Sequence, residues 1–249
     1  MESNGYTRKA YHAGSWYQSN PDHLHETLSG YLKKAETEGT INGDSIPRGI
    51  IAPHAGFSYS GNTAGHAYNG LRLALEKGWR GTVLVLHPSH HVYLDGCAVS
   101  GATSIKTPLG DLLVDQLFRR ELLNTGEFSV MNKETDEKEH SGEMQYPFIA
   151  KAFFDSTVES SSMLVLPIMI GAISDAQEGH FGRILGKFLA REKVFTVISS
   201  DFCHWGKRFG YTPTTPPDHI KAPDSIKEIF EYVSFQVEVQ VALNLNLNL

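Results

Sequence analysis

Uninterrupted apolar runs alternate with amphipathic segments along the chain, and this alternation predicts an α/β protein. Short runs of aliphatic and β-branched residues, bounded by Gly, Pro or Ser, are typical of strands buried on both faces. A shorter strand is expected within residues 93–101, around Cys97. The four clearest runs are residues 49–52, 82–86, 163–171 and 194–198.

Helices are predicted between these runs. Asn20 followed by Pro21 is a good helix start, and Leu24, Leu28 and Leu32 recur on one face as far as Ala35. The charged stretch 133–148 is expected to begin as a solvated loop and to become helical before Phe154, with Pro147 interrupting or kinking it. We expect one domain with a central, mostly parallel or mixed sheet flanked by helices. Residues 6–19 lack a clean period and predict an irregular segment, and further helices are predicted over residues 62–71, over residues 111–123 and after Ser174.

Polar side chains follow three of the predicted strands. His54 comes after the strand at 49–52, His90 and His91 follow the strand at 82–86, and residues 201–204 follow the last strand. In open α/β sheets, ligands bind at the carboxyl edge of the strands. These loops are therefore the candidate site.

Two imidazoles with one carboxylate suit a transition metal. His54, His90 and Asp201 would form such a set, which fits non-haem iron and also admits zinc or copper. Successive side chains of an extended backbone point in opposite directions. We therefore assign His90 to the metal and His91 to an outer position, with a packing or capping role as the alternative for His91.

Four other residues are weaker candidates. Cys203 precedes His204, but a small buried thiol explains it more simply than a nucleophile does. His140 and Glu143 could approach the site, and a structural role is the alternative for both. The acidic run around residues 136–139 is most simply a solvated loop.

Composition limits the partners. The 249 residues carry a formal net charge of −6 with interspersed Lys and Arg, which argues against nucleic acid. No stretch is apolar enough to span a bilayer, and the first residues lack the apolar core of a signal peptide. Two cysteines fit a reducing compartment, so a cytoplasmic protein is expected. Twelve histidines raise the expectation of a metal or acid–base site.

Six ordered motifs together carry a family resemblance. The chain between about Tyr11 and Tyr211 resembles the Memo family, which is similar in fold to the class III extradiol dioxygenases. The motifs are HAGSWY at 12–17, APHAG at 52–56, PSHHV at 88–92, TPLGDL at 107–112, EHSGEMQYP at 139–147 and SSDFCHWG at 199–206.

The resemblance implies a metal site in which His54 and His90 are ligands, lined by Asp201 and His204. By analogy with the dioxygenases, His204 would act as acid and base, with Asp201 orienting its ring. The family has been linked to iron or copper handling with redox activity, to phosphotyrosine-peptide binding and to cell-motility signalling. Two functions follow: a dioxygenase-like enzyme acting on a small aromatic or related substrate, or a non-catalytic adaptor that binds phosphotyrosine peptides.

The chain departs from the family pattern in two places. His87 stands where the family has glycine before the proline. A Cys-Gly-Arg-His-Pro stretch, which the resemblance implies as the source of a third metal ligand, is absent. We therefore expect a C-terminally incomplete Memo-like domain over residues 1–227 and a divergent, low-complexity tail over residues 228–249.

Overall fold

The computed structural model describes residues 5–39, 47–156, 163–201 and 207–210. The chain forms two compact units, of which the first comprises Met1–Ser174 with Phe188–Ser200 and the second comprises Asp175–Lys187 with Asp201–Leu249. Every strand that the structure describes belongs to the first unit. The α/β class, with a mixed sheet flanked by helices, is confirmed.

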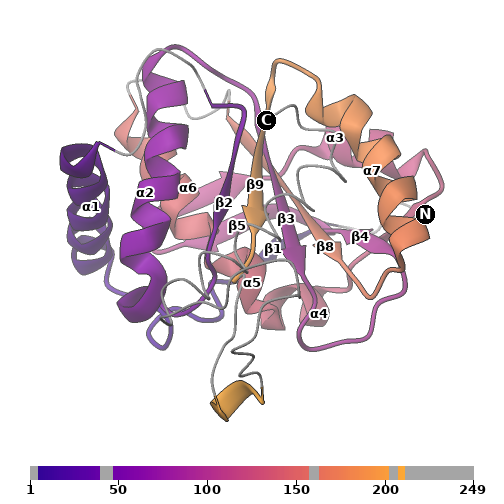
Figure 1. Ribbon diagram of the computed structural model, residues 1–249, viewed down its shortest axis with the longest axis horizontal. Coiled ribbons are helices and arrows are strands. Elements are labelled where there is room, and N and C mark those ends of the chain that lie inside the picture. The colour runs from indigo at the N-terminus through magenta and orange to yellow at the C-terminus, as the bar shows by residue number, and fades with distance from the viewer. Residues whose placement is uncertain (1–4, 40–46, 157–162, 202–206, 211–249) are drawn as a thin grey trace, which may run out of the picture. The chain divides into compact units, whose positions relative to one another are not determined.

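A six-stranded sheet forms the centre of the first unit (Figure 1). Neighbouring strands are parallel except β8 and β4, which are antiparallel. A smaller sheet has the order β1–β5–β6, with β1 parallel and β6 antiparallel to β5. In spatial order the large sheet contains β2 (Gly49–Ala52), β9 (Val194–Ser199), β3 (Thr82–Pro88), β8 (Leu164–Ile170), β4 (Cys97–Val99) and β7 (Phe128–Val130). The small sheet contains β1 (Tyr6–Arg8), β5 (Ala102–Thr107) and β6 (Gly110–Leu113).

Helices of the first unit pack beside these sheets. Figure 1 shows α2 next to β2 and α1 on the outer side of α2, in agreement with the contacts between them. Helix α6 contacts α2 and the small sheet, and the short α5 contacts β3. The helices of the first unit are α1 (Pro21–Glu38), α2 (Phe57–Glu76), α3 (Gln116–Leu123), α4 (Lys133–Lys138), α5 (His140–Glu143) and α6 (Tyr146–Asp155). The second unit contains most of α7 (Asp175–Leu189) and a 3₁₀ turn at Lys207–Phe209.

Parallel pairing brings the ends of separate strands to one edge. Strands β2, β9, β3 and β8 run in the same direction, so their carboxyl ends meet at the same edge of the sheet. Ala52 pairs with Ser199 at the ends of β2 and β9. Figure 1 shows α5 at this edge. The loops that the sequence marks as the site therefore leave the sheet together.

Two of the predicted helices have different boundaries. The segment 111–123 divides into β6 and α3, because Leu112 and its neighbours pair with β5 and Asp115 then caps α3 by accepting the N–H of Phe118 at 2.9 Å. Helix α2 is twenty residues long, twice the predicted extent. Its glycines fit against α1, so they stabilise the helix pair rather than end the helix.

Other local predictions also needed correction. Residues 6–8 form β1 instead of irregular chain, because they pair with β5. The stretch 133–148 begins with α4 and not with a loop. The predicted interruption is present, because α5 ends at Glu143 and α6 starts at Tyr146, with Pro147 in its first turn, where the missing N–H is tolerated. The predicted tail 228–249 lies outside the described residues.

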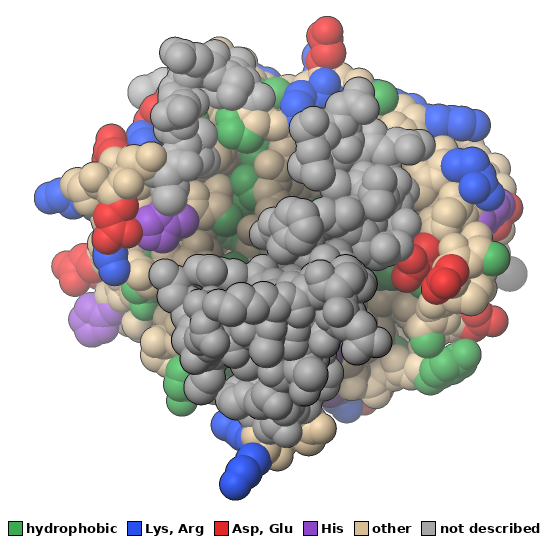
Figure 2. All heavy atoms as spheres, viewed as in Figure 1, with side chains coloured by type: hydrophobic (Ala, Val, Ile, Leu, Met, Phe, Trp, Pro, Cys, Tyr) green, Lys and Arg blue, Asp and Glu red, His purple; other side chains and the backbone are tan. Residues whose placement is uncertain are grey.

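Surface charge and helix composition complete the description of the fold. Figure 2 shows acidic and basic side chains interspersed over the described part of one face. Among the described residues, no helix combines the length and apolar character that crossing a membrane requires.

The crossing of α1 and α2 depends on glycine. A Cβ placed on Gly65 would lie 2.8 Å from the backbone oxygen of Tyr31, and one placed on Gly30 would meet nothing within 4 Å. We predict that Gly65→Ala lowers the free energy of unfolding by about 1–3 kcal/mol through overpacking. Gly30→Ala, at an exposed position of α1, should raise it by roughly 0.5–1 kcal/mol. Urea denaturation measures both, and equal effects would contradict the close helix contact.

Candidate metal centre

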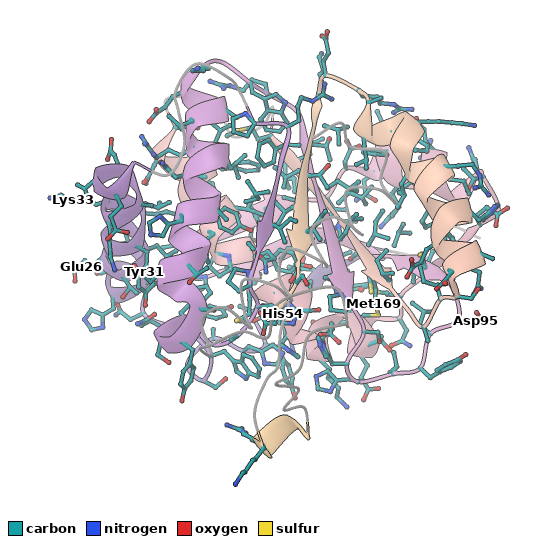
Figure 3. All side chains as sticks on the ribbon, viewed as in Figure 1. Glu26, Tyr31, Lys33, His54, Asp95 and Met169 are labelled. Carbon is teal, nitrogen blue, oxygen red and sulfur yellow. The ribbon has the colours of Figure 1, made fainter. Side chains whose placement is uncertain are left out.

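His54 lies just beyond the end of β2, at the carboxyl edge of the sheet, where Figure 3 labels it. Its side chain is buried, and its Nδ1 lies 2.9 Å from the hydroxyl oxygen of Ser199, the last residue of β9. The pairing of β2 with β9 places these residues side by side. A metal ion would bind this ring through Nε2, on the side opposite Ser199.

His90 follows β3 and is oriented by a carboxylate. Its Nδ1 lies 2.9 Å from Oε1 of Glu139, and its backbone N–H donates to Oε2 at 2.7 Å. Burial by itself would raise the pKa of Glu139, but the donors on His90 and Ser141 outweigh it and hold the pKa well below its usual range. A charged Glu139 favours the Nδ1–H form of His90, which again directs Nε2 towards a metal.

His140 opens α5 and completes a cluster of three imidazoles. Its ring centroid lies 4.5 Å from that of His90 and 5.6 Å from that of His54. One nitrogen from each ring falls within 4.8 Å of the others. Burial lowers the pKa of His140 to about 4, and the neighbouring histidines act in the same direction. A neutral ring can donate its lone pair to a metal.

This donor set fits the metals that the resemblance implies. Imidazole nitrogen suits iron, copper and zinc, and three imidazoles leave coordination positions open for other ligands. The structure brings His54 and His90 together and places His140, which the sequence put outside the ligand set, beside them. The role of these residues as metal ligands stays a prediction.

His91 lies at the rim of the cluster. Its ring centroid is 5.8 Å from that of His140, and its side chain is exposed. Residues 90–92 form a bend and not an extended strand, so adjacent side chains need not point in opposite directions. His91, Glu139 and His140 form a second possible donor group. The outer position predicted for His91 stays a prediction.

Glu143 lies in a buried cluster of hydrogen bonds. Its carboxylate accepts from Arg8 at 2.6 Å, from the Tyr17 hydroxyl at 2.8 Å and from the backbone N–H of His12 at 2.7 Å. It therefore holds the segment that contains His12 and Trp16. The Trp16 ring centroid lies 4.5 Å from that of His140.

The acidic run at 136–139 is not a solvated loop throughout. Asp136 and Glu139 are buried, 2% and 1% exposed. Asp136 pairs with Arg8 at 3.0 Å, and Glu139 accepts from His90, so each buried carboxylate has a cationic or N–H partner. Glu137 is partly buried, and its carboxylate accepts the N–H of Lys9. The sequence prediction failed because alternating buried and exposed acids look the same as a solvated charge run.

The last predicted loop is only partly described. Cys203 and His204 lie outside the described residues, and Asp201 belongs to the second unit. The ligand and acid–base roles of Asp201 and His204, and the interpretation of Cys203, stay predictions.

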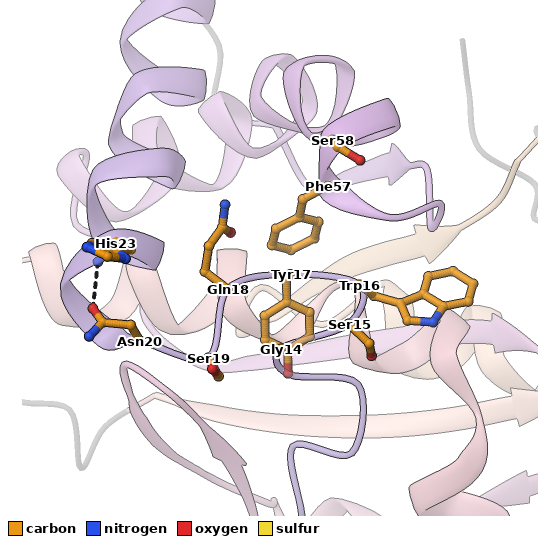
Figure 4. Close-up of a pocket in the computed structure, with 10 residues that line it drawn as sticks. All are labelled: Gly14, Ser15, Trp16, Tyr17, Gln18, Ser19, Asn20, His23, Phe57 and Ser58. Carbon is orange, nitrogen blue, oxygen red and sulfur yellow. Dashed lines mark hydrogen bonds between the residues drawn. The ribbon is translucent and has the colours of Figure 1, made fainter.

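A shallow hollow of about 410 Å³ has Trp16 in its lining (Figure 4). It is lined mainly by residues 14–20, with Phe57 and Ser58 across from them. Trp16 belongs both to this lining and to the ring contacts of His140. A molecule bound in the hollow would therefore contact a residue that touches the imidazole cluster.

His87 is a buried histidine behind the cluster. Its Nδ1 lies 3.1 Å from the hydroxyl of Ser141, and among the described residues its Nε2 is a buried nitrogen without a hydrogen-bond partner. Burial lowers its pKa from 6.5 to about 4, although Glu139 and Asp136 oppose this and Arg8 adds to it.

The low pKa of His87 predicts a pH dependence. Because its charged form is disfavoured in the folded state, the folded protein loses stability as the pH falls from about 6.5 to about 4, by roughly 3 kcal/mol from this group. Urea unfolding of the metal-free protein across this range measures the loss. His87→Leu should lose less stability than the wild type by about this amount, and identical pH profiles would contradict the assignment.

Arg8 should be more important for stability than other arginines. It is fully buried between Asp136 and Glu143, so Arg8→Met leaves two buried carboxylates without their cation. We expect a loss of about 3–5 kcal/mol in urea unfolding. Arg72→Met, which breaks pairs with the exposed Glu36 and Glu76, should cost at most about 1 kcal/mol. A similar loss of unfolding free energy in both variants would show that the buried ion pairs stabilise the fold no more than the exposed ones.

The chain is similar to known proteins over most of its length. A family model described as Memo-like protein matches residues 8–236. Protein MEMO1 of Xenopus laevis is 42% identical over 212 residues, which cover 85% of this chain and 67% of the frog protein. Human protein MEMO1 is 41% identical over 205 residues, 82% of this chain and 65% of the human protein. Protein memo-1 homolog of Caenorhabditis elegans is 40% identical over 218 residues, 86% of this chain and 58% of the worm protein. The chain thus spans about two thirds or less of these relatives, and it belongs to the Memo family.

Proposed function

We propose that this chain binds a transition metal through His54, His90 and His140. Iron is the first choice, and copper or zinc are also compatible with imidazole donors. The observation that carries the proposal is the convergence of three ring nitrogens within 4.8 Å at the carboxyl edge of the sheet. The cognate reaction proposed is dioxygenase-like chemistry on a small aromatic or related molecule.

The surrounding residues support a binding site more than a structural cluster. Glu139 and Ser199 hold the Nδ1 side of two of the rings, an arrangement that is common around metal-binding histidines. With Nδ1 held in this way, Nε2 is the nitrogen through which each of these two rings would bind a metal. When bound, iron or copper would supply a centre that exchanges electrons.

The protein's own groups would then bind and orient the substrate. Trp16 offers an aromatic face between the hollow and the imidazoles, where a small planar molecule could stack. From the family resemblance, we further propose His204 as the residue that accepts and returns a proton, with Asp201 orienting its ring.

Metal analysis tests this proposal. After anaerobic purification and loading with Fe²⁺ or Co²⁺, the wild type should retain about one ion per chain. Loss of a residue that only hydrogen-bonds to a ligand lowers metal affinity by roughly 10–100-fold. His54→Ala, His90→Ala and His140→Ala should each lower the metal affinity by at least this factor. His66→Ala, in a histidine of α2 that pairs with Glu38, is the matched control and should bind as the wild type does.

The individual variants separate the roles of the three histidines. If His140→Ala binds metal as tightly as the wild type, His140 lies outside the ligand set and the residues at 201–204 become the source of the third ligand. Retention of metal in a His54→Ala, His90→Ala double variant would overturn the whole proposal.

The hollow beside Trp16 favours a second candidate, an adaptor that binds phosphotyrosine peptides. It is open, and it is lined by Trp16 and His23; an imidazole that is protonated attracts phosphate. Binding of a phosphotyrosine peptide that persists at full affinity after metal removal, and that Trp16→Ala weakens, would support the adaptor. Binding of the unphosphorylated peptide with equal affinity would exclude it.

A further inference from the structure

Ser199 occupies a buried position where three groups meet its hydroxyl. It ends β9, and its side chain lies beside His54, whose Nδ1 is 2.9 Å away. The hydroxyl also lies 2.8 Å from the backbone oxygen of Ser141 and 2.9 Å from Nε2 of Gln145. All three partners are buried.

A hydroxyl has one hydrogen to donate and two lone pairs with which to accept. The oxygen of Ser141 can only accept, so it takes the hydrogen of Ser199. The amide nitrogen of Gln145 can only donate, so it occupies one lone pair. The contact with His54 must use the remaining lone pair, and this requires that Nδ1 of His54 carries a hydrogen.

The orientation of the Gln145 amide is fixed by its other partners. Its Nε2 also donates to the backbone oxygen of Pro53 at 3.1 Å, and its Oε1 accepts from the hydroxyl of Tyr68 at 2.9 Å. A flipped amide would place an oxygen against the oxygen of Pro53. The direction of each hydrogen bond from Tyr68 through Gln145 to Ser199 and Ser141 is therefore determined.

We infer that Ser199, held by Gln145, is a positioning residue that keeps a hydrogen on Nδ1 of His54, so that the neutral ring adopts the Nδ1–H tautomer. In that tautomer the lone pair lies on Nε2, the ring nitrogen that does not contact Ser199. Glu139 acts in the same way on His90 through a charged acceptor, whereas the acceptor for His54 is neutral. The tautomer lock follows from the hydrogen bonds alone, and its use in metal binding rests on the proposed function.

Nitrogen NMR of the histidine rings in the metal-free protein tests the lock directly. Long-range proton–nitrogen spectra distinguish the two neutral tautomers, and a His54→Ala variant identifies the His54 signals by their loss. The wild type should show Nδ1–H at His54. Ser199→Ala should shift the ring towards Nε2–H, the form that histidine favours in water, and Ser199→Thr should restore Nδ1–H.

The control is Thr107→Ala. The buried hydroxyl of Thr107 donates to the backbone oxygen of Gly110 and accepts the N–H of Leu109, and neither partner is a histidine. This variant should leave the His54 tautomer unchanged. If Ser199→Ala does not fold, Ser199→Cys replaces it, since a thiol of similar volume accepts hydrogen bonds only weakly. An Nε2–H ring in the wild type, or an unchanged tautomer in the folded Ser199 variant, would overturn the inference.

Metal affinity gives the second readout. Competition with a coloured chelator for Co²⁺ should show binding about 10–100-fold weaker in Ser199→Ala than in Ser199→Thr or Thr107→Ala. A locked tautomer in a wild type that binds no metal would refute the proposed function and leave the lock intact. Tight metal binding that Ser199→Ala does not alter would refute the positioning role and leave the metal centre intact.

Discussion

The buried guanidinium of Arg8 is the interaction on which the site depends. It donates to the carboxylates of Asp136 and Glu143, and also to the backbone oxygens of Asp136 and Glu139. Charges removed from water must be partnered, so these groups can adopt few other arrangements in the folded chain. Through them, β1 fixes the connection between α4 and α5, and this connection places Glu139 and His140 at the edge of the sheet.

The second constraint is the order of the parallel strands. Because β9 lies between β2 and β3, Ser199 ends beside His54, and His90 leaves β3 on the same edge. Each ring then finds its outer partner on a different element, Ser199 on β9 for His54 and Glu139 before α5 for His90. The cluster is therefore a product of topology, and no short sequence motif could contain it.

Much of this was accessible from sequence. The apolar runs predicted five strands of the large sheet, and Pro53 and Pro88 marked the loops that carry His54 and His90. The signal for Glu139 and His140 was present but ambiguous, since they stand in a charge-dense run. Trp16 was noted only as an aromatic in irregular chain, because nothing local indicates that Glu143 fixes its segment beside His140.

The sequence by itself determined five strands of the large sheet and the histidines that follow two of them, because the spacing of apolar residues is local. Only the tertiary structure decided that Asp136 and Glu139 are buried, that His140 joins His54 and His90, and that Ser199 sets the tautomer of His54. Arg8 and Asp136 are 128 residues apart in the chain. The burial of a charge depends on such distant partners, and local periodicity carries no information about them.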